Sequence, residues 1–156
     1  MEDKVAIITG ASTGIGRCMS IELSNSNFHV ILISRNKKKL EFVKKEIDNL
    51  GNKCTLIEGD VSSEDSIKSI FNQIKLFNNI EILINNAGLG IFSKIQNISY
   101  SDWDKQMNTN LKGSFMMTKN IVPIMINNNC GQIIFINSGC AFTNVPAASE
   151  SGNREV

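Results

Sequence analysis

Short apolar runs alternate with amphipathic segments along the chain, and this alternation limits the possible folds more than any other feature. The stretches Val5 to Thr9 and His29 to Ile33 are nearly continuous apolar runs, typical of strands buried on both faces of a parallel sheet. Runs of this kind separated by helix-length segments indicate repeated β–α units. We expect five strands, at residues 5–9, 29–33, 54–58, 81–85 and 131–137.

Apolar residues spaced by three or four positions predict the helices between these strands. Two such stripes follow the second and third strands: Leu40, Val43, Ile47 and Leu50; and Ile67, Ile70, Ile74 and Phe77. A first helix is expected from Gly14 to about Ser26, and a long helix over residues 102–128.

Capping residues and a proline predict where two helices begin or break. Ser62 with Asp65 resembles a capping pair before the helix that follows the third strand, and Ser99 with Asp102 resembles one before the long helix. Pro123 lacks a backbone N–H, so it predicts a kink or local break near the end of the long helix.

The order of these elements predicts the α/β class of fold. Strands that alternate with helices form an open parallel sheet with right-handed crossovers and helices on both faces. We therefore expect a Rossmann-type, doubly wound parallel sheet of about five strands in the order 3-2-1-4-5, incomplete at its far edge.

The composition is that of an ordinary globular protein and excludes two classes of partner. Of 156 residues, 42% are hydrophobic and 20% charged, with a formal net charge of +1. Nucleic-acid binding would require a basic face, so we expect no nucleic acid partner. No apolar stretch is long enough to span a bilayer, so we expect no membrane partner. The start of the chain does not resemble a secretion signal, which predicts a cytoplasmic protein.

Cysteine and histidine usage disfavours a metal site. Cys18, Cys54, Cys130 and Cys140 show no paired ligand spacing, and we interpret them as reduced structural thiols. His29 is the only histidine, which argues against a His-based metal site or a Ser-His-Asp triad. We expect no bound metal.

A glycine-rich turn connects the first strand to the first helix. It reads Thr9-Gly10-Ala11-Ser12-Thr13-Gly14-Ile15-Gly16, with the spacing Gly-x-x-x-Gly-x-Gly. Glycine occurs in turns for purely structural reasons. Between a strand and a helix, however, such a turn lets main chain approach a pyrophosphate and points helix N–H groups at it. The sequence therefore predicts cofactor contacts at Gly10, Ser12, Thr13, Gly14, Ile15 and Gly16.

The end of the second strand bears on which dinucleotide fits. An acidic residue there would bind the adenosine ribose and favour NAD(H), but the sequence reads Ser34-Arg35-Asn36. The guanidinium of Arg35 suits a 2′-phosphate, and Arg17 is a candidate second cation. The alternative is that both arginines are simply solvated. NADP(H) is favoured over NAD(H).

Five motifs together resemble the short-chain dehydrogenase/reductase family. They are Thr9 to Gly16, Asp60-Val61, Asn85-Asn86-Ala87-Gly88, Asn110-Leu111-Lys112-Gly113, and Ser138. They occur in the family's order, at about its spacing, and cover nearly the whole chain. The first and third are the most specific.

The resemblance implies roles for residues along the cofactor. Asp60 and Val61 would contact the adenine ring, with Asp60 accepting from its amino group. Asn86, Ala87 and Gly88 would shape the floor beneath the adenosine and steady the sheet.

The resemblance also implies two catalytic residues. Asn110 would hold a water in a proton relay, although an asparagine in a helix is more often merely solvated. Ser138 would orient the carbonyl of a small-molecule carbonyl or alcohol substrate, at the strand edge where such sheets bind ligands.

The sequence departs from the family at its general acid. The family's tyrosine, followed four residues later by a lysine, would fall near position 151, but Ser151 and Glu155 stand there. The only tyrosine, Tyr100, precedes the long helix and is followed four residues later by Asp104. Because hydride delivery to a carbonyl requires a proton donor, we expect little or no turnover.

These observations predict that the chain descends from an NADP(H)-dependent oxidoreductase. We expect it to be inactive, because it lacks the tyrosine and lysine that would complete the catalytic site. We assign residues 1–138 to the NADP(H)-binding domain and 139–156 to a truncated or degenerate start of the catalytic segment. Homo-oligomerisation through helix 102–128 is expected, weakened by the truncation. The alternatives are a non-catalytic dinucleotide-binding or regulatory module, and a doubly wound domain of unrelated function.

Overall fold

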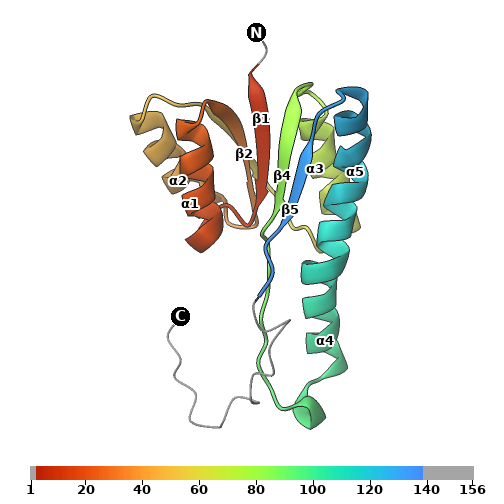
Figure 1. Cartoon of the computed structure of the whole chain (residues 1–156). Coiled ribbons are helices and arrows are strands. Elements are labelled where there is room, and N and C mark those ends of the chain that lie inside the picture. Colours follow the sequence, from red (N-terminus) through yellow and green to blue (C-terminus); the bar gives the residue numbers. More distant parts are fainter. Residues whose placement is uncertain (1–2, 139–156) are drawn as a thin grey trace.

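The computed structural model describes residues 3–138, in which one parallel five-stranded sheet is covered by helices on both faces (Figure 1). The strand order is β3-β2-β1-β4-β5, as predicted. The strands are β1 (Lys4–Thr9), β2 (Phe28–Ser34), β3 (Cys54–Glu58), β4 (Ile80–Asn85) and β5 (Gln132–Phe135). The segment assigned to the catalytic part, residues 139–156, lies outside the described residues.

Helices cover each face of the sheet in pairs. Helices α1 and α2 lie on one face, and α3 and α5 on the other (Figure 1). The helices are α1 (Gly14–Asn25), α2 (Lys37–Asn49), α3 (Glu64–Ile74), α4 (Tyr100–Met107) and α5 (Ser114–Asn127), with a short 3₁₀ turn η1 (Ile95–Asn97) and a π-helical segment η2 (Asn108–Gly113). Helix α4 extends beyond the edge of the sheet at which the strands end.

Alternation along the central strand divides the core into two clusters. Val5 and Ile7 of β1 face α3 and α5, whereas Ala6 and Ile8 face α1 and α2. The four side chains are at most 3% exposed, which explains why the sequence of β1 is apolar throughout instead of alternating with polar residues. Both faces of β1 are therefore buried.

The structure corrects three local predictions. Ser63, not Ser62, caps α3 by accepting from Ser66 N, while Ser62 donates to Asp60. Phe77 lies beyond the end of α3, though it packs against the same core. Tyr100 is the first residue of α4 and does not lie in a preceding loop.

The long helix is irregular at a different place from the one predicted. Ser99 caps α4 as expected, with its side chain accepting from Asp102 N. Pro123 is accommodated within α5, which continues to Asn127. The irregularity instead is η2, where six residues adopt π-helical geometry between α4 and α5. A single π-helical turn inserted into an α-helix leaves helical apolar patterns on both sides of it, so the sequence pattern did not reveal it.

No helix within residues 3–138 combines the length and the apolarity needed to cross a membrane.

Candidate dinucleotide site

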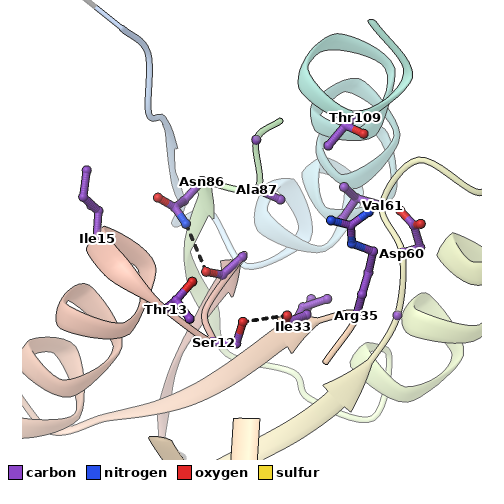
Figure 2. A pocket seen from close by; sticks show the side chains of 14 residues that line it. Ser12, Thr13, Ile15, Ile33, Arg35, Asp60, Val61, Asn86, Ala87 and Thr109 are labelled. Carbon is purple, nitrogen blue, oxygen red and sulfur yellow. Dashed lines mark hydrogen bonds between the residues drawn. The ribbon is translucent and has the colours of Figure 1, made fainter. Parts of the chain in front are cut away.

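A cavity of about 310 Å³ opens where the strands of the sheet end (Figure 2). Its walls come from the turn after β1, the ends of β2 and β3, the turn after β4 and the start of η2. The lining residues are Gly10, Ser12, Thr13, Ile15, Ile33, Ser34, Arg35, Gly59, Asp60, Val61, Asn86, Ala87, Gly88 and Thr109. Ligands of open α/β sheets bind at this edge, where the strand order reverses.

Two glycines let the turn after β1 approach the turn after β4. Gly10 has a φ of +67°, and a Cβ there would lie 2.9 Å from Cα of Ala87. A Cβ on Gly16 would lie 2.4 Å from the carbonyl oxygen of Gly10. Main chain lies at both positions, so no side-chain movement could relieve these contacts. Glycine is required here by close packing, in addition to any role toward a ligand.

The Thr9 hydroxyl joins the same two turns. It accepts hydrogen bonds from the backbone N–H groups of Asn86 and Ala87, each at 3.0 Å, and donates to Ile84 O at 3.3 Å. The Asn86 amide donates to the carbonyl oxygen of Thr9 at 3.0 Å and to that of Gly10 at 3.3 Å, the second bond being drawn in Figure 2. Thr9 is 2% exposed, so these bonds are shielded from water. The floor of the cavity is thereby fixed before any ligand binds.

The second wall is attached to the end of β2. The hydroxyls of Ser12 and Ser34 are 2.8 Å apart (Figure 2), and Ala11 N donates to Ile33 O at 3.1 Å. These bonds place the first half of the glycine-rich turn beside Arg35, the residue that follows β2.

The two arginines considered from sequence have different environments. Arg35 is exposed at the rim of the cavity, and within residues 3–138 its guanidinium has no ion-pair partner. Arg17 is not a lining residue. Its guanidinium donates to both carboxylate oxygens of Glu46 on α2, at 2.6 and 2.8 Å. Only Arg35 therefore offers an uncommitted positive charge at the cavity.

Asp60 and Val61 form the wall on the β3 side. One carboxylate oxygen of Asp60 accepts from the N–H and the hydroxyl of Ser62, at 2.9 and 2.7 Å. Asp60 N donates to Ser66 Oγ at 2.7 Å, which ties the turn to α3. The carboxylate is thus oriented by its own loop, and its second oxygen has no partner among the described residues.

The helical segment above the cavity holds the chain that follows Gly88. Asn110, in η2, accepts from Leu89 N at 2.7 Å and donates to Leu89 O at 2.9 Å. One turn earlier, Gln106 accepts from Ile91 N at 3.0 Å. Asn110 is therefore more than a solvated helix residue, because together with Gln106 it fixes the segment from Leu89 to Ile91 alongside the helix.

Most of the residues expected to contact a cofactor lie in or beside one cavity. Eleven of the fifteen expected cofactor contacts line it: Gly10, Ser12, Thr13, Ile15, Ser34, Arg35, Asp60, Val61, Asn86, Ala87 and Gly88. The other four, Gly14, Gly16, Arg17 and Asn36, do not, and neither does the candidate catalytic residue Asn110. Ser138 is exposed and lies three residues beyond β5, rather than at its end.

Three lining residues were missed by sequence analysis. Ile33 and Gly59 immediately precede residues that were named, so the ends of β2 and β3 signalled them. Thr109 is 7% exposed and adjoins Asn110. A buried polar residue in a helix that passes over strand ends is the signal that could have identified Thr109.

Among the described residues, Cys18, Cys54 and Cys130 are free thiols, and no cluster of three or more metal-ligating side chains occurs. Burial raises the pKa of the Cys54 thiol, which keeps it protonated near neutral pH.

The strand order, the glycine-rich turn and the cavity at the strand ends define the Rossmann class of α/β proteins. Residues 4–150 match the short chain dehydrogenase family. The chain belongs to this family, as its motifs indicated.

Curated relatives include two enzymes named 3-oxoacyl-[acyl-carrier-protein] reductase FabG. The chain is 34% identical to the one from Aquifex aeolicus, over 92% of this chain and 58% of the relative. It is 32% identical to the one from Thermotoga maritima, over 97% of this chain and 64% of the relative. The chain therefore spans about three fifths of the length of these relatives.

Solved structures share the same fold. A metagenomic short-chain oxidoreductase in complex with NADP superimposes with a TM-score of 0.85 and 31% identity, over 88% of this chain and 63% of that one. A variant of actinorhodin polyketide ketoreductase with NADPH gives a TM-score of 0.88 and 26% identity, over 95% of this chain and 59% of that one.

Proposed function

We propose that the chain binds NADP(H) in the cavity at the strand ends and forms the cofactor-binding part of an oxidoreductase. Such an enzyme transfers a hydride between the nicotinamide and a carbonyl or alcohol substrate. The observation that carries the proposal is the unpaired Arg35 guanidinium at the rim of a cavity whose opposite wall is the glycine-rich turn. The similar structures with bound NADP and NADPH support it.

The described residues fit the adenosine end of this cofactor. Main chain around Gly10 and the first turn of α1 would approach the pyrophosphate, Asp60 would accept from the adenine amino group, and Arg35 would bind the 2′-phosphate. Val61 in the lining offers apolar surface to one flat face of the adenine ring.

Isothermal titration calorimetry with NADPH and NADH tests the proposal. Wild-type protein is expected to bind NADPH more tightly than NADH. Arg35→Gln should weaken NADPH binding about tenfold or more, because a charge-assisted hydrogen bond contributes roughly 1.5–3 kcal/mol, and should leave NADH binding unchanged. Lys119→Gln, which removes an exposed positive charge on α5, is the matched control. The absence of NADPH binding by folded wild-type protein would contradict the proposal.

We further propose that Ser138 orients the substrate carbonyl and that Asn110 contributes to a proton relay in the complete catalytic unit. In support, Asn110 is fixed by two hydrogen bonds to Leu89, beside the cavity. In a protein that contains the complete catalytic unit, substitution of either residue should lower kcat far more than it raises the Kd for NADPH.

A second candidate is a module that binds the dinucleotide without reducing a substrate. Ser151 and Glu155 stand where the family resemblance places a tyrosine and a lysine, and a serine hydroxyl does not titrate near neutral pH. This module would bind NADPH in calorimetry and leave its absorbance at 340 nm unchanged when carbonyl compounds are added. Catalysed oxidation of NADPH by residues 1–156 alone would exclude it.

The cytoplasmic location stays a prediction.

We also propose self-association through α4, η2 and α5. Trp103, Leu111 and Phe115 lie at four- and eight-residue spacing along this unit and are 49%, 62% and 61% exposed. A row of exposed large apolar side chains is typical of an interaction surface.

A further inference from the structure

Arg17 and Glu46 form a bidentate ion pair that connects α1 to α2 beside the cavity. Arg17 Nε lies 2.8 Å from one carboxylate oxygen of Glu46, and a terminal guanidinium nitrogen lies 2.6 Å from the other. The hydrogen bonds raise the pKa of Arg17 and lower that of Glu46. Both groups are therefore charged at neutral pH, and each side chain is about two fifths exposed, at 42% and 41%.

Arg17 lies one helical turn behind a residue of the cavity wall. Its backbone N–H donates to Thr13 O at 3.2 Å, and Thr13 lines the cavity. Side chains four residues apart lie on one face of a helix, and long side chains lean toward the helix N-terminus. A released Arg17 side chain would therefore extend over Thr13 toward the rim.

Thr13 and Arg35 lie on opposite walls of the cavity, on either side of Ser12 (Figure 2). The contact of 2.8 Å between the Ser12 and Ser34 hydroxyls joins the first half of the glycine-rich turn to the residue preceding Arg35. A guanidinium leaning over Thr13 would approach the same anionic group as Arg35. The carboxylate of Glu46 and that anionic group therefore compete for one cation.

We propose that Glu46 is a specificity-determining residue, which holds Arg17 away from the 2′-phosphate and so limits the preference for NADP(H) over NAD(H). This inference rests on the proposed function, because it concerns the same cavity. It gives Arg17 a role that depends on Glu46. In the wild-type chain Arg35 alone selects the phosphorylated cofactor, because the guanidinium of Arg17 stays bound to Glu46.

The test is a thermodynamic cycle measured by calorimetry with NADPH and NADH. Glu46→Gln should raise the ratio of NADPH affinity to NADH affinity about two- to fivefold, the range expected for a partly exposed charge pair. Arg17→Gln alone should leave that ratio unchanged, and Arg17→Gln combined with Glu46→Gln should abolish the gain. Because a glutamine oxygen can still accept from Arg17, Glu46→Ala is a second variant that should give at least the same gain.

Glu41→Gln is the matched control, since it removes the same charge from an exposed position of α2 that makes no contact with Arg17. Its affinity ratio should equal that of the wild type. A purely structural tie between α1 and α2 would lower thermal stability without raising the ratio. An unchanged or lower ratio in both Glu46 variants, or equal gains for NADPH and NADH, would overturn the inference. Failure of the wild type to bind NADPH would instead count against the proposed function.

Discussion

At the residue scale, the Thr9 hydroxyl is the most connected side-chain atom near the cavity. It holds two N–H groups of the turn after β4 and one carbonyl of β4 itself. Removing it leaves buried donors without partners, which costs more than the net value of the lost hydrogen bonds.

Thr9→Val keeps the shape of the side chain and removes the hydroxyl. We expect the free energy of unfolding to fall by about 2–3 kcal/mol, because two shielded N–H groups lose their acceptor. Urea denaturation followed by circular dichroism measures this change. Thr9→Ser, which keeps the hydroxyl, should lose less, and a Thr9→Val variant as stable as the wild type would contradict the assignment.

His29 gives the stability of the fold a dependence on pH. Burial is the largest effect and lowers its pKa below the ordinary value of 6.5, with Asp3 acting in the opposite direction and Lys53 and Lys44 adding to the decrease. Its Nε2 lies 2.8 Å from Thr55 Oγ1, and its ring contacts Phe77.

Because the unfolded chain binds this proton more readily than the folded chain, stability should be constant above about pH 6.5 and fall as the pH decreases toward the lowered pKa. His29→Gln removes the titrating group. In denaturant titrations between about pH 7 and pH 5, above the range of most carboxylates, the variant should show a smaller loss of stability than the wild type. Equal losses would show that His29 does not contribute.

At the element scale, the turn between β1 and α1 is fixed by main-chain contacts. An alanine Cβ at position 16 would lie 2.4 Å from Gly10 O and 2.5 Å from the Asn86 amide nitrogen. To relieve these contacts, the first turn of α1 would have to move away from Asn86. The pyrophosphate is proposed to bind at this first turn of α1.

Gly16→Ala should lower the free energy of unfolding by about 1–3 kcal/mol, as overpacking does, and abolish measurable NADPH binding. Gly51→Ala provides a control of similar cost, because Gly51 has a φ of +77° but open space around its Cβ, far from the cavity. Calorimetry should show normal NADPH affinity for Gly51→Ala. Loss of binding in both variants would mean that stability alone explains the effect.

The elements were predicted well where one physical signal dominates. Apolar runs identify β1 and β2 because strands buried on both faces allow few polar residues. The cap of α3 was misplaced by one residue because Ser62 and Ser63 are adjacent and equally suitable. The segment η2 could not be predicted, since its helical pattern continues through it.

The same reasoning explains what was predicted of the candidate site. Residues that follow a strand, such as Arg35 and Asp60, are brought to one edge by any parallel sheet, so their neighbourhood follows from chain order. The partner of Arg17 does not follow in this way. Glu46 is 29 residues away, and the relative rotation of α1 and α2 decides whether the two charges meet.

At the scale of the whole molecule, the face formed by α4, η2 and α5 is the one proposed for self-association. Trp103, Leu111 and Phe115 expose apolar surface there, and Phe135 of β5 is 50% exposed. Within the described residues β5 is paired on one side only, with β4. Both features favour association with another surface.

Sedimentation velocity should show a weight-average mass that rises with protein concentration. Combining Leu111→Lys with Phe115→Lys should shift the protein to the monomer, because two charges would enter the apolar row. Phe42→Lys alters an equally exposed aromatic residue on α2, 66% exposed, and should leave the association unchanged. A wild-type chain that is monomeric at all concentrations would contradict the proposed self-association.

The cavity draws its wall from residues 10 to 109, so the ligand touches segments that enter the fold at widely separated points of the chain. A bound dinucleotide would contact four β–α connections at once and hold them together. At a ligand concentration one hundred times its Kd, this linkage adds about 2.7 kcal/mol to the free energy of unfolding. Cellular cofactor supply would then govern how long the chain survives proteases, and starvation for the dinucleotide would shorten its lifetime.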